Sequence, residues 1–183
     1  MAGAAEARRR GDPLGGRPDH PGRRARGADP ARNLTQLRES SREHAALPPE
    51  NIHAMSVEAA DLDAAARQYA ELLERIAGAP PMLDLVHLGL GADGHTASLV
   101  PGDPVLDVTN DDVAVTGPYQ GRRRMTLTYP LINRAHSILW LVTGGEKSDA
   151  LRRLRAADPS IPAGRVRQDS ALVLADEAAA ADL

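Results

Sequence analysis

The chain has 183 residues and a net charge of −3, and this length is enough for one domain with a substantial core. It contains no cysteine, which excludes disulfides and thiolate metal sites and fits a cytoplasmic protein. No apolar run approaches the roughly 20 residues of a membrane span, and the acidic balance argues against nucleic acid as the main partner.

Residues 1–32 differ in composition from the rest of the chain. They carry eight arginines against four acidic residues, and their larger apolar residues are Met1 and Leu14 alone. Such a stretch buries too little apolar surface to offset its ordering entropy, so we expect it to be disordered. A basic arm that binds nucleic acid is the alternative, although the segment has no aromatic residue. The folded domain is expected to span residues 33–183.

Two helix signals follow in chain order. Asn33 can cap a helix with Gln36 as its reciprocal partner in a capping box, and Pro48 ends that helix. A second helix is predicted over Leu62–Ile76, where apolar side chains recur at helical spacing and Gly78 stands at the C-terminal cap.

Apolar runs of strand length then alternate with short helical segments. Strands are predicted at residues 83–90, 113–116, 125–128, 137–143 and 171–174, and helices at 130–135 and 146–157. A near-continuous apolar run such as 83–90 is typical of a parallel strand that is covered on both faces. The alternation predicts an α/β domain with a mainly parallel sheet.

The first candidate site is the turn that follows the strand at 83–90. Ligands of open α/β sheets bind just past the carboxyl ends of the strands. His95 lies there as a natural acid or base near neutral pH, and Asp93 can orient its ring or raise its basicity. Gly91 and Gly94 allow a sharp turn and a close approach of the ligand. A structural turn with a solvated histidine is the alternative, and the glycine spacing does not complete a dinucleotide fingerprint.

The second candidate site follows the strand at 137–143. Lys147, the single lysine of the chain, lies in the first turn of the predicted helix 146–157. A cation there opposes the helix dipole, so its position makes better sense if an anion such as phosphate also binds at the helix start. A solvent-facing lysine is the alternative. Arg124, next to the start of the strand at 125–128, is the arginine of its cluster that we expect to reach a ligand.

The remaining polar residues give weaker signals. His87 lies inside an apolar strand and is expected to be a packed, hydrogen-bonded core residue, while His136 is expected to be structural. No pair of histidines has a metal-ligand spacing, and Ser98 lacks the G-x-S-x-G setting of a serine hydrolase. We therefore expect no metal.

Two blocks of the sequence are familiar. DLVHLGLGADGHTASLVPG, residues 84–102, resembles the signature of the 6-phosphogluconolactonases, except that Val100 stands where the family usually has phenylalanine. RMTLTYPLINRAHSILWLVTGGEKSDALRRL, residues 124–154, is similar to a second family stretch. Glucosamine-6-phosphate deaminases share the histidine turn but continue into Phe-Asn-Glu-Pro. The resemblance covers residues 29–183 and favours the lactonase.

The resemblance implies a Rossmann-like three-layer α/β domain and the hydrolysis of 6-phospho-D-glucono-1,5-lactone to 6-phosphogluconate in the oxidative pentose phosphate pathway, without metal or cofactor. It implies that His95 is the general base on a water molecule, that Asp93 supports it, and that Lys147, with Arg124, binds the phosphate. The amides of the two turn glycines would stabilise the oxyanion. The expected protein is a cytoplasmic monomer whose partner is the sugar-phosphate lactone.

The beginning of the chain departs from the family pattern. Members usually start with a helix, a strand and an S-G-G-S/T loop, and a later strand ends in G-D-E-R; residues 1–28 contain none of these. Our hypothesis is a truncated or frame-shifted product that lacks the N-terminal strands, which a reading of the gene's other frames would test. The alternatives to an active lactonase are an enzyme like the glucosamine-6-phosphate deaminases, an inactive remnant and a regulator with a basic arm.

Overall fold

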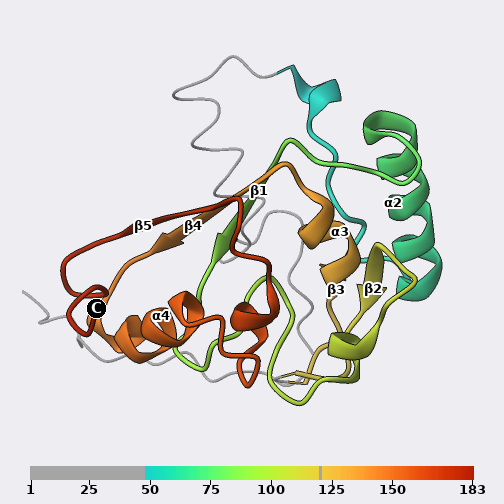
Figure 1. Cartoon of the computed structure of the whole chain (residues 1–183). Helices are drawn as coiled ribbons and strands as arrows, with labels where there is room; N and C mark the ends of the chain where they lie inside the picture. The colour runs from blue at the N-terminus through green and yellow to red at the C-terminus, as the bar shows by residue number, and fades with distance from the viewer. Residues whose placement is uncertain (1–47, 120) are drawn as a thin grey trace, which may run out of the picture.

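The computed structural model describes residues 48–119 and 121–183 (Figure 1). The helices are α2 (Leu62–Ala77), α3 (Tyr129–Arg134) and α4 (Ser148–Arg155), and short 3-10 helices are η1 (Pro49–Asn51), η2 (Pro104–Asp107), η3 (Gly145–Lys147) and η4 (Pro162–Arg165). The strands are β1 (Leu85–Gly89), β2 (Val113–Val115), β3 (Met125–Leu127), β4 (Ser137–Val142) and β5 (Ala171–Ala175). The expected disorder of residues 1–32, the helix opened by Asn33 and the missing N-terminal strands concern residues outside this described part.

Three strands of the described part form the main sheet, and they run parallel in the order β1-β4-β5. The register pairs Gly89 of β1 with Leu141 of β4 and Leu141 with Leu174 of β5. The carboxyl ends of the strands therefore lie at one edge of the sheet, and the turns that follow β1 and β4 leave it side by side (Figure 1). The predicted α/β class with a mainly parallel sheet is confirmed.

A second sheet, here called the ribbon, consists of two strands in the described part of the chain and lies apart from the first. β2 and β3 were expected as strands and are found as strands, but they pair antiparallel with each other rather than joining the main sheet. Helix α2 packs against this ribbon (Figure 1), and its Ala66 and Leu73 share a core with Val113 and Met125. The ribbon is too short to stand alone, so this core holds it in place.

Helix α2 follows the signals that predicted it, with one exception. The side chain of Asp61 accepts a hydrogen bond from the amide of Ala64 at 2.9 Å and caps the first turn. Gly78 ends the helix with a φ of +89°, which a residue with a side chain rarely adopts. Ile76, expected on the apolar side, is 52% exposed because the partner ribbon does not extend to the last turn of the helix.

The main sheet is covered on one face, here called the buried face. The side chains of the buried face pack on α4 and on the segments that follow β1 and α4. They are Val86, Leu88, Ile138, Trp140 and Val142. Leu151 and Leu154 of α4 are fully buried against them, as the helical spacing predicted. A helix with an apolar stripe thus closes this side of the sheet.

The opposite face carries leucines that no described element covers. We call it the leucine face; its members Leu85, Leu141, Leu172 and Leu174 are about half exposed. The expectation that parallel strands are covered on both faces is therefore wrong for the described residues. His87 lies on this face as well and is exposed, so its prediction as a packed core residue is wrong. Strand alternation sends His87 to the side opposite Val86 and Leu88.

Candidate active site

The turn after β1 presents His95 at the carboxyl edge of the sheet. The amide of Gly91 donates to the carbonyl of His95 at 2.9 Å, and the amide of Gly94 donates to the carbonyl of Gly91 at 2.9 Å. Gly94 has a φ of +81°, and a side chain on Gly91 would collide with the imidazole of His95. Glycine is therefore required at both positions, as the sequence predicted, and the reason at Gly91 is the close approach of the ring.

His95 and Asp93 form a pair in this turn. The Nδ1 atom of the His95 ring lies 2.6 Å from Oδ1 of Asp93, and the same carboxylate oxygen accepts the backbone N–H of His95 at 3.1 Å. A carboxylate only accepts hydrogen bonds, so Nδ1 carries the proton and the lone pair of the neutral ring is on Nε2. The ring is 33% exposed, so it remains open to solvent and small molecules.

The electrostatics of Asp93 favour its charged form. Burial raises the pKa of its carboxyl, but the hydrogen bonds from the backbone and ring of His95, together with the charge of that ring, outweigh burial and lower the pKa below its ordinary value. Asp93 therefore stays ionised around neutral pH, where it can hold the Nδ1 proton of the ring. The sequence-based expectation that Asp93 orients His95 fits this geometry.

Buried threonines anchor the two ends of the turn to neighbouring strands. The hydroxyl of Thr96, which is fully buried, donates to the carbonyl of Gly89 at 2.9 Å and ties the chain back to the end of β1. The amide of Ser98 donates to the hydroxyl of Thr126 in β3 at 3.2 Å. The antiparallel ribbon therefore lies directly against the segment that follows His95. Sequence reasoning missed both threonines because their hydrogen-bond partners lie 7 and 28 residues away in the chain.

The turn after β4 carries Lys147. Gly144 has a φ of +98°, and Lys147 ends η3. Lys147 stands at the N-cap of α4, because this helix begins at Ser148 rather than at the predicted residue 146. Its side chain is half-buried, and no ion pair or hydrogen bond joins it to another described residue. The neighbouring strand register places this turn beside the turn of His95. A half-buried cation that has no partner in the described part of the chain is available to bind an anion.

Carboxylates from the end of the chain also reach this turn. The amide of Gly144 donates to the carboxylate of Asp176 at 3.1 Å, and the hydroxyl of Ser148 donates to the carboxylate of Asp182. The positive end of α4 thus already has anionic neighbours. Lys147 is a cation of this turn that remains for a ligand.

Arg124 lies on the ribbon beside the histidine turn. Its guanidinium stacks on the ring of Tyr119, 5.0 Å from the ring centre, and its backbone pairs with Thr116. Residues two apart on an extended chain point to the same side, so Arg124 faces the same side as Thr126, whose hydroxyl binds the amide of Ser98. This places Arg124 on the side of the ribbon that adjoins the segment after His95.

The glycine amides are less available than the sequence suggested. Those of Gly91 and Gly94 both donate to carbonyls inside the turn, so neither is open to an oxyanion in this structure. The amide of Ala92, at the exposed tip of the turn, has no acceptor among the described residues. It is the donor that the turn itself still offers.

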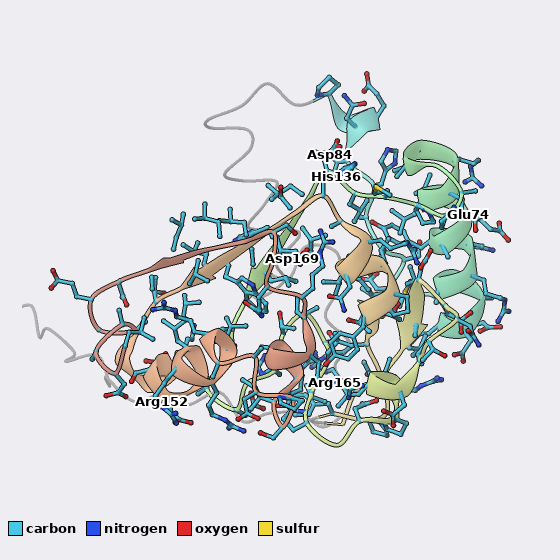
Figure 2. The ribbon with its side chains drawn as sticks, viewed as in Figure 1. Glu74, Asp84, His136, Arg152, Arg165 and Asp169 are labelled. Atoms are coloured by element: carbon cyan, nitrogen blue, oxygen red, sulfur yellow. The ribbon has the colours of Figure 1, made fainter. Side chains whose placement is uncertain are left out.

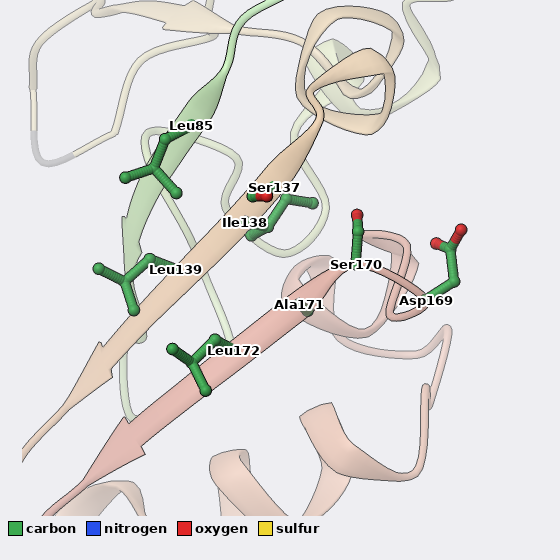
Figure 3. A pocket seen from close by; sticks show the side chains of 8 residues that line it. All are labelled: Leu85, Ser137, Ile138, Leu139, Asp169, Ser170, Ala171 and Leu172. Carbon is green, nitrogen blue, oxygen red and sulfur yellow. The ribbon is translucent and has the colours of Figure 1, made fainter.

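A hollow lies against the main sheet, away from the histidine turn. It has a volume of about 390 Å³ and is lined by residues at the beginnings of the strands, Leu85, Ser137 and Ala171 among them, together with Leu139 and Leu172 (Figure 3). His136 and Asp84 lie at this same end (Figure 2), where the amide of His136 donates to the carbonyl of Leu83 at 2.8 Å. The expected structural place of His136 at the junction of α3 and β4 fits this contact. The hollow is at the opposite end of the sheet from His95.

Comparison with known proteins identifies the relationship. The family model described as glucosamine-6-phosphate isomerases/6-phosphogluconolactonase matches residues 23–174. The chain belongs to this family. A 6-phosphogluconolactonase of Synechocystis sp. is 42% identical over 145 residues, which are 75% of this chain and 60% of the relative. A 6-phosphogluconolactonase of Mycobacterium bovis is 41% identical over 167 residues, 85% of this chain and 68% of the relative.

A solved structure shows the same fold. The 6-phosphogluconolactonase from Trypanosoma cruzi superimposes with a TM-score of 0.68 at 26% identity, covering 87% of this chain and 69% of that one. This chain thus spans about 60% to 70% of the length of these family members. The resemblance seen in residues 84–102 and 124–154 is confirmed, and both blocks lie in the matched region. No helix in the described part of the chain is long and apolar enough to cross a membrane.

Proposed function

We propose that this chain hydrolyses 6-phospho-D-glucono-1,5-lactone to 6-phosphogluconate, the lactone step of the oxidative pentose phosphate pathway. The observation that carries the proposal is the 2.6 Å contact between Nδ1 of His95 and the ionised Asp93, presented at the carboxyl edge of the sheet. An ester needs only an activated water molecule and donors for the developing oxyanion. The names of the curated relatives give the substrate.

The pair determines how the proton moves. The carboxylate of Asp93 accepts a hydrogen bond from the Nδ1–H of His95, so Nε2 of the ring is unprotonated. Nε2 takes a proton from a water molecule as the oxygen of that water attacks the lactone carbonyl. The tetrahedral intermediate collapses with cleavage of the bond between the carbonyl carbon and the ring oxygen. The imidazolium then returns its proton to the leaving ring oxygen, which becomes a hydroxyl, and the free acid loses its proton to solvent. Water is consumed, and no other reactant is needed.

The two cations of the site are proposed to bind the phosphate. Lys147 follows the strand next to the histidine turn, and its side chain has no partner among the described residues. Arg124 lies on the ribbon that adjoins the segment after His95. Phosphate binding by such side chains positions the lactone for attack and contributes to KM more than to kcat. Because both glycine amides are engaged, the amide of Ala92 is the proposed oxyanion donor of the turn. The cytoplasmic location and the monomeric state remain predictions from the sequence.

The test is lactone hydrolysis by the whole chain, corrected for spontaneous opening. His95→Asn is expected to lower kcat by about 10²- to 10⁴-fold, because the general base is lost. His136→Asn is the matched control: it removes an exposed histidine at the other end of the sheet and should leave kcat unchanged.

Two results would contradict the proposal. One is a wild-type chain no faster than spontaneous opening, which is the outcome expected of an inactive remnant. The other is a His95→Asn variant with the rate of the wild type. Glucosamine-6-phosphate serves as the comparison substrate, because the family also contains the isomerases of that sugar. Faster turnover of glucosamine-6-phosphate than of the lactone would assign the site to the second activity.

A further inference from the structure

We propose that the segment Ile161–Ala163 is a positioning element for His95, which holds the histidine turn from the side opposite Asp93. The inference rests on the proposed function of His95 and adds residues from a distant part of the sequence to that site. The segment lies between α4 and β5, about 70 residues after the turn, and overlaps the start of η4.

The peptide group that joins Gly94 to His95 is bonded at both of its polar ends. Its carbonyl, on Gly94, accepts the amide of Ala163 at 2.9 Å, and its N–H, on His95, donates to the carboxylate of Asp93 at 3.1 Å. The orientation of this peptide determines the direction in which the His95 side chain leaves the backbone. Two hydrogen bonds at opposite ends of one plane prevent its rotation, so the contact between the ring and Asp93 depends on Ala163 as well.

Ile161 holds the same peptide by packing. Its side chain is buried, and its Cβ would lie 2.5 Å from a Cβ built on Gly94. Isoleucine therefore fills the space that the absence of a side chain at Gly94 leaves. A glycine with a φ of +81° can relax to many conformations, and a close-packed branched side chain removes that freedom.

The segment is itself anchored. The hydroxyl of Tyr129 donates to the carbonyl of Pro162 at 2.8 Å, and the guanidinium of Arg165 lies 4.8 Å from the centre of the tyrosine ring. Burial raises the pKa of Tyr129 to about 12, against an opposing effect of Arg165, so the hydroxyl stays a donor at any pH at which the enzyme would work. Tyr129 follows β3, and the anchor therefore connects the segment to the ribbon that borders the site.

A second anchor lies on the other side of the segment. The carboxylate of Asp158 accepts the Nε–H of Arg153 at 2.9 Å and the amide of Ser160 at 2.9 Å. Gly164 packs on the backbone of Asp158 so closely that a side chain at this position would collide with it. The segment is thus held at both ends, and α4 supplies one of the anchors.

The experiment compares Ile161→Ala with Leu154→Ala in the whole chain. Both substitutions remove three carbons from a buried side chain, but Leu154 lies on α4 and does not contact the turn through any described interaction. One readout is the Nδ1 proton of His95 in the NMR spectrum of the 15N-labelled protein, which does not need turnover. The other is kcat and KM for the lactone.

Ile161→Ala is expected to weaken or broaden the Nδ1 proton signal and to lower kcat by about 10- to 100-fold with little change in KM, because misplacement of a reacting group acts on the chemical step. Leu154→Ala should lower the melting temperature similarly and keep the signal and kcat. Ile161→Val, which restores a branched Cβ, should recover most of both readouts.

Tyr129→Phe provides a milder variant if Ile161→Ala does not fold. It removes the hydroxyl that holds Pro162 and is expected to reduce kcat in the same direction by a smaller factor, again without changing KM. Equal signals and equal kcat in Ile161→Ala and Leu154→Ala would overturn the proposal. If the wild type lacks lactonase activity, the proposed function fails, while the Nδ1 signal still decides whether the segment positions the ring.

Discussion

The two faces of the parallel sheet are built from the same strands and nearly the same residue types, but their surroundings differ. On the buried face, Leu88 and Trp140 are almost fully enclosed by α4 and its neighbours. On the leucine face, Leu141 and Leu172 are about half exposed. The apolar character of a strand therefore shows that it lies in a sheet, but it does not show which faces of that sheet the chain covers.

The same contrast explains where the candidate site lies. The turn of His95 belongs to the covered side: Ile161 packs on its glycine, and Thr96 and Leu99 are fully buried beside it. The hollow at the beginnings of the strands is lined mainly by side chains that are exposed or half-buried. Catalytic groups need to be held within a fraction of an ångström, and only close packing supplies that precision.

The largest expected effect is a difference in stability between the same leucine-to-alanine substitution made on each face. Leu88→Ala on the buried face should lower the free energy of unfolding by about 2 to 5 kcal/mol, because it leaves a cavity in a packed core. Leu172→Ala on the leucine face should change it by about 0.5 kcal/mol or less, because that side chain is 60% exposed. Urea denaturation measures both. A loss at Leu172 as large as that at Leu88 would show that the leucine face is covered in solution.

A smaller effect concerns the link between α4 and the segment that holds the turn. Hydrogen bonds from Ser160 and Arg153 lower the pKa of Asp158 to about 2. A carboxyl with a depressed pKa in the folded state stabilises the protein above its unfolded value near 4, and this stability is lost as the pH falls toward 2. Asp158→Asn should reduce the loss of stability between pH 4 and pH 2. Identical acid unfolding curves for the variant and the wild type would contradict the assignment.

Trp140→Phe should have a still smaller effect. The indole Nε1–H of Trp140 is buried without a hydrogen-bond partner among the described residues, and an unpaired buried donor costs about 1 to 3 kcal/mol. Phenylalanine removes that donor and loses some packing volume, so the two changes should cancel to within about 1 kcal/mol. Thermal unfolding checks this. A loss of 3 kcal/mol or more would mean that the indole N–H has a partner in solution.

The smallest effect on stability is expected on the leucine face. Leu172→Lys should alter the free energy of unfolding by about 0.5 kcal/mol or less, since the lysine ammonium can remain in water. The same substitution should reduce the fluorescence of a dye that binds exposed apolar surface, such as 8-anilinonaphthalene-1-sulfonate. Unchanged dye fluorescence would argue that this face is not the exposed apolar surface of the protein in solution.

Local signals in the sequence predicted much of the fold. The C-terminal cap of α2, the apolar strands and the helical face of α4 are determined by neighbouring residues, so they could be predicted from short stretches. The pairing and covering of strands depend on residues far apart in the chain, and these were the features that the sequence predicted wrongly. β2 and β3 form a separate ribbon, and His87 lies on an exposed face, because strand partners and covering layers come from elsewhere in the chain.

The candidate site also combines features that local sequence indicates with contacts that depend on the whole fold. The sequence by itself singled out His95, Asp93 and Lys147 as candidates, because a glycine turn at a strand end and an isolated lysine at a helix start are local patterns. Only the tertiary structure decided that the glycine amides are engaged, that carboxylates reach the start of α4, and that Ile161 packs on Gly94. These contacts join residues far apart in the chain, and only folding brings such residues to the same edge of the sheet.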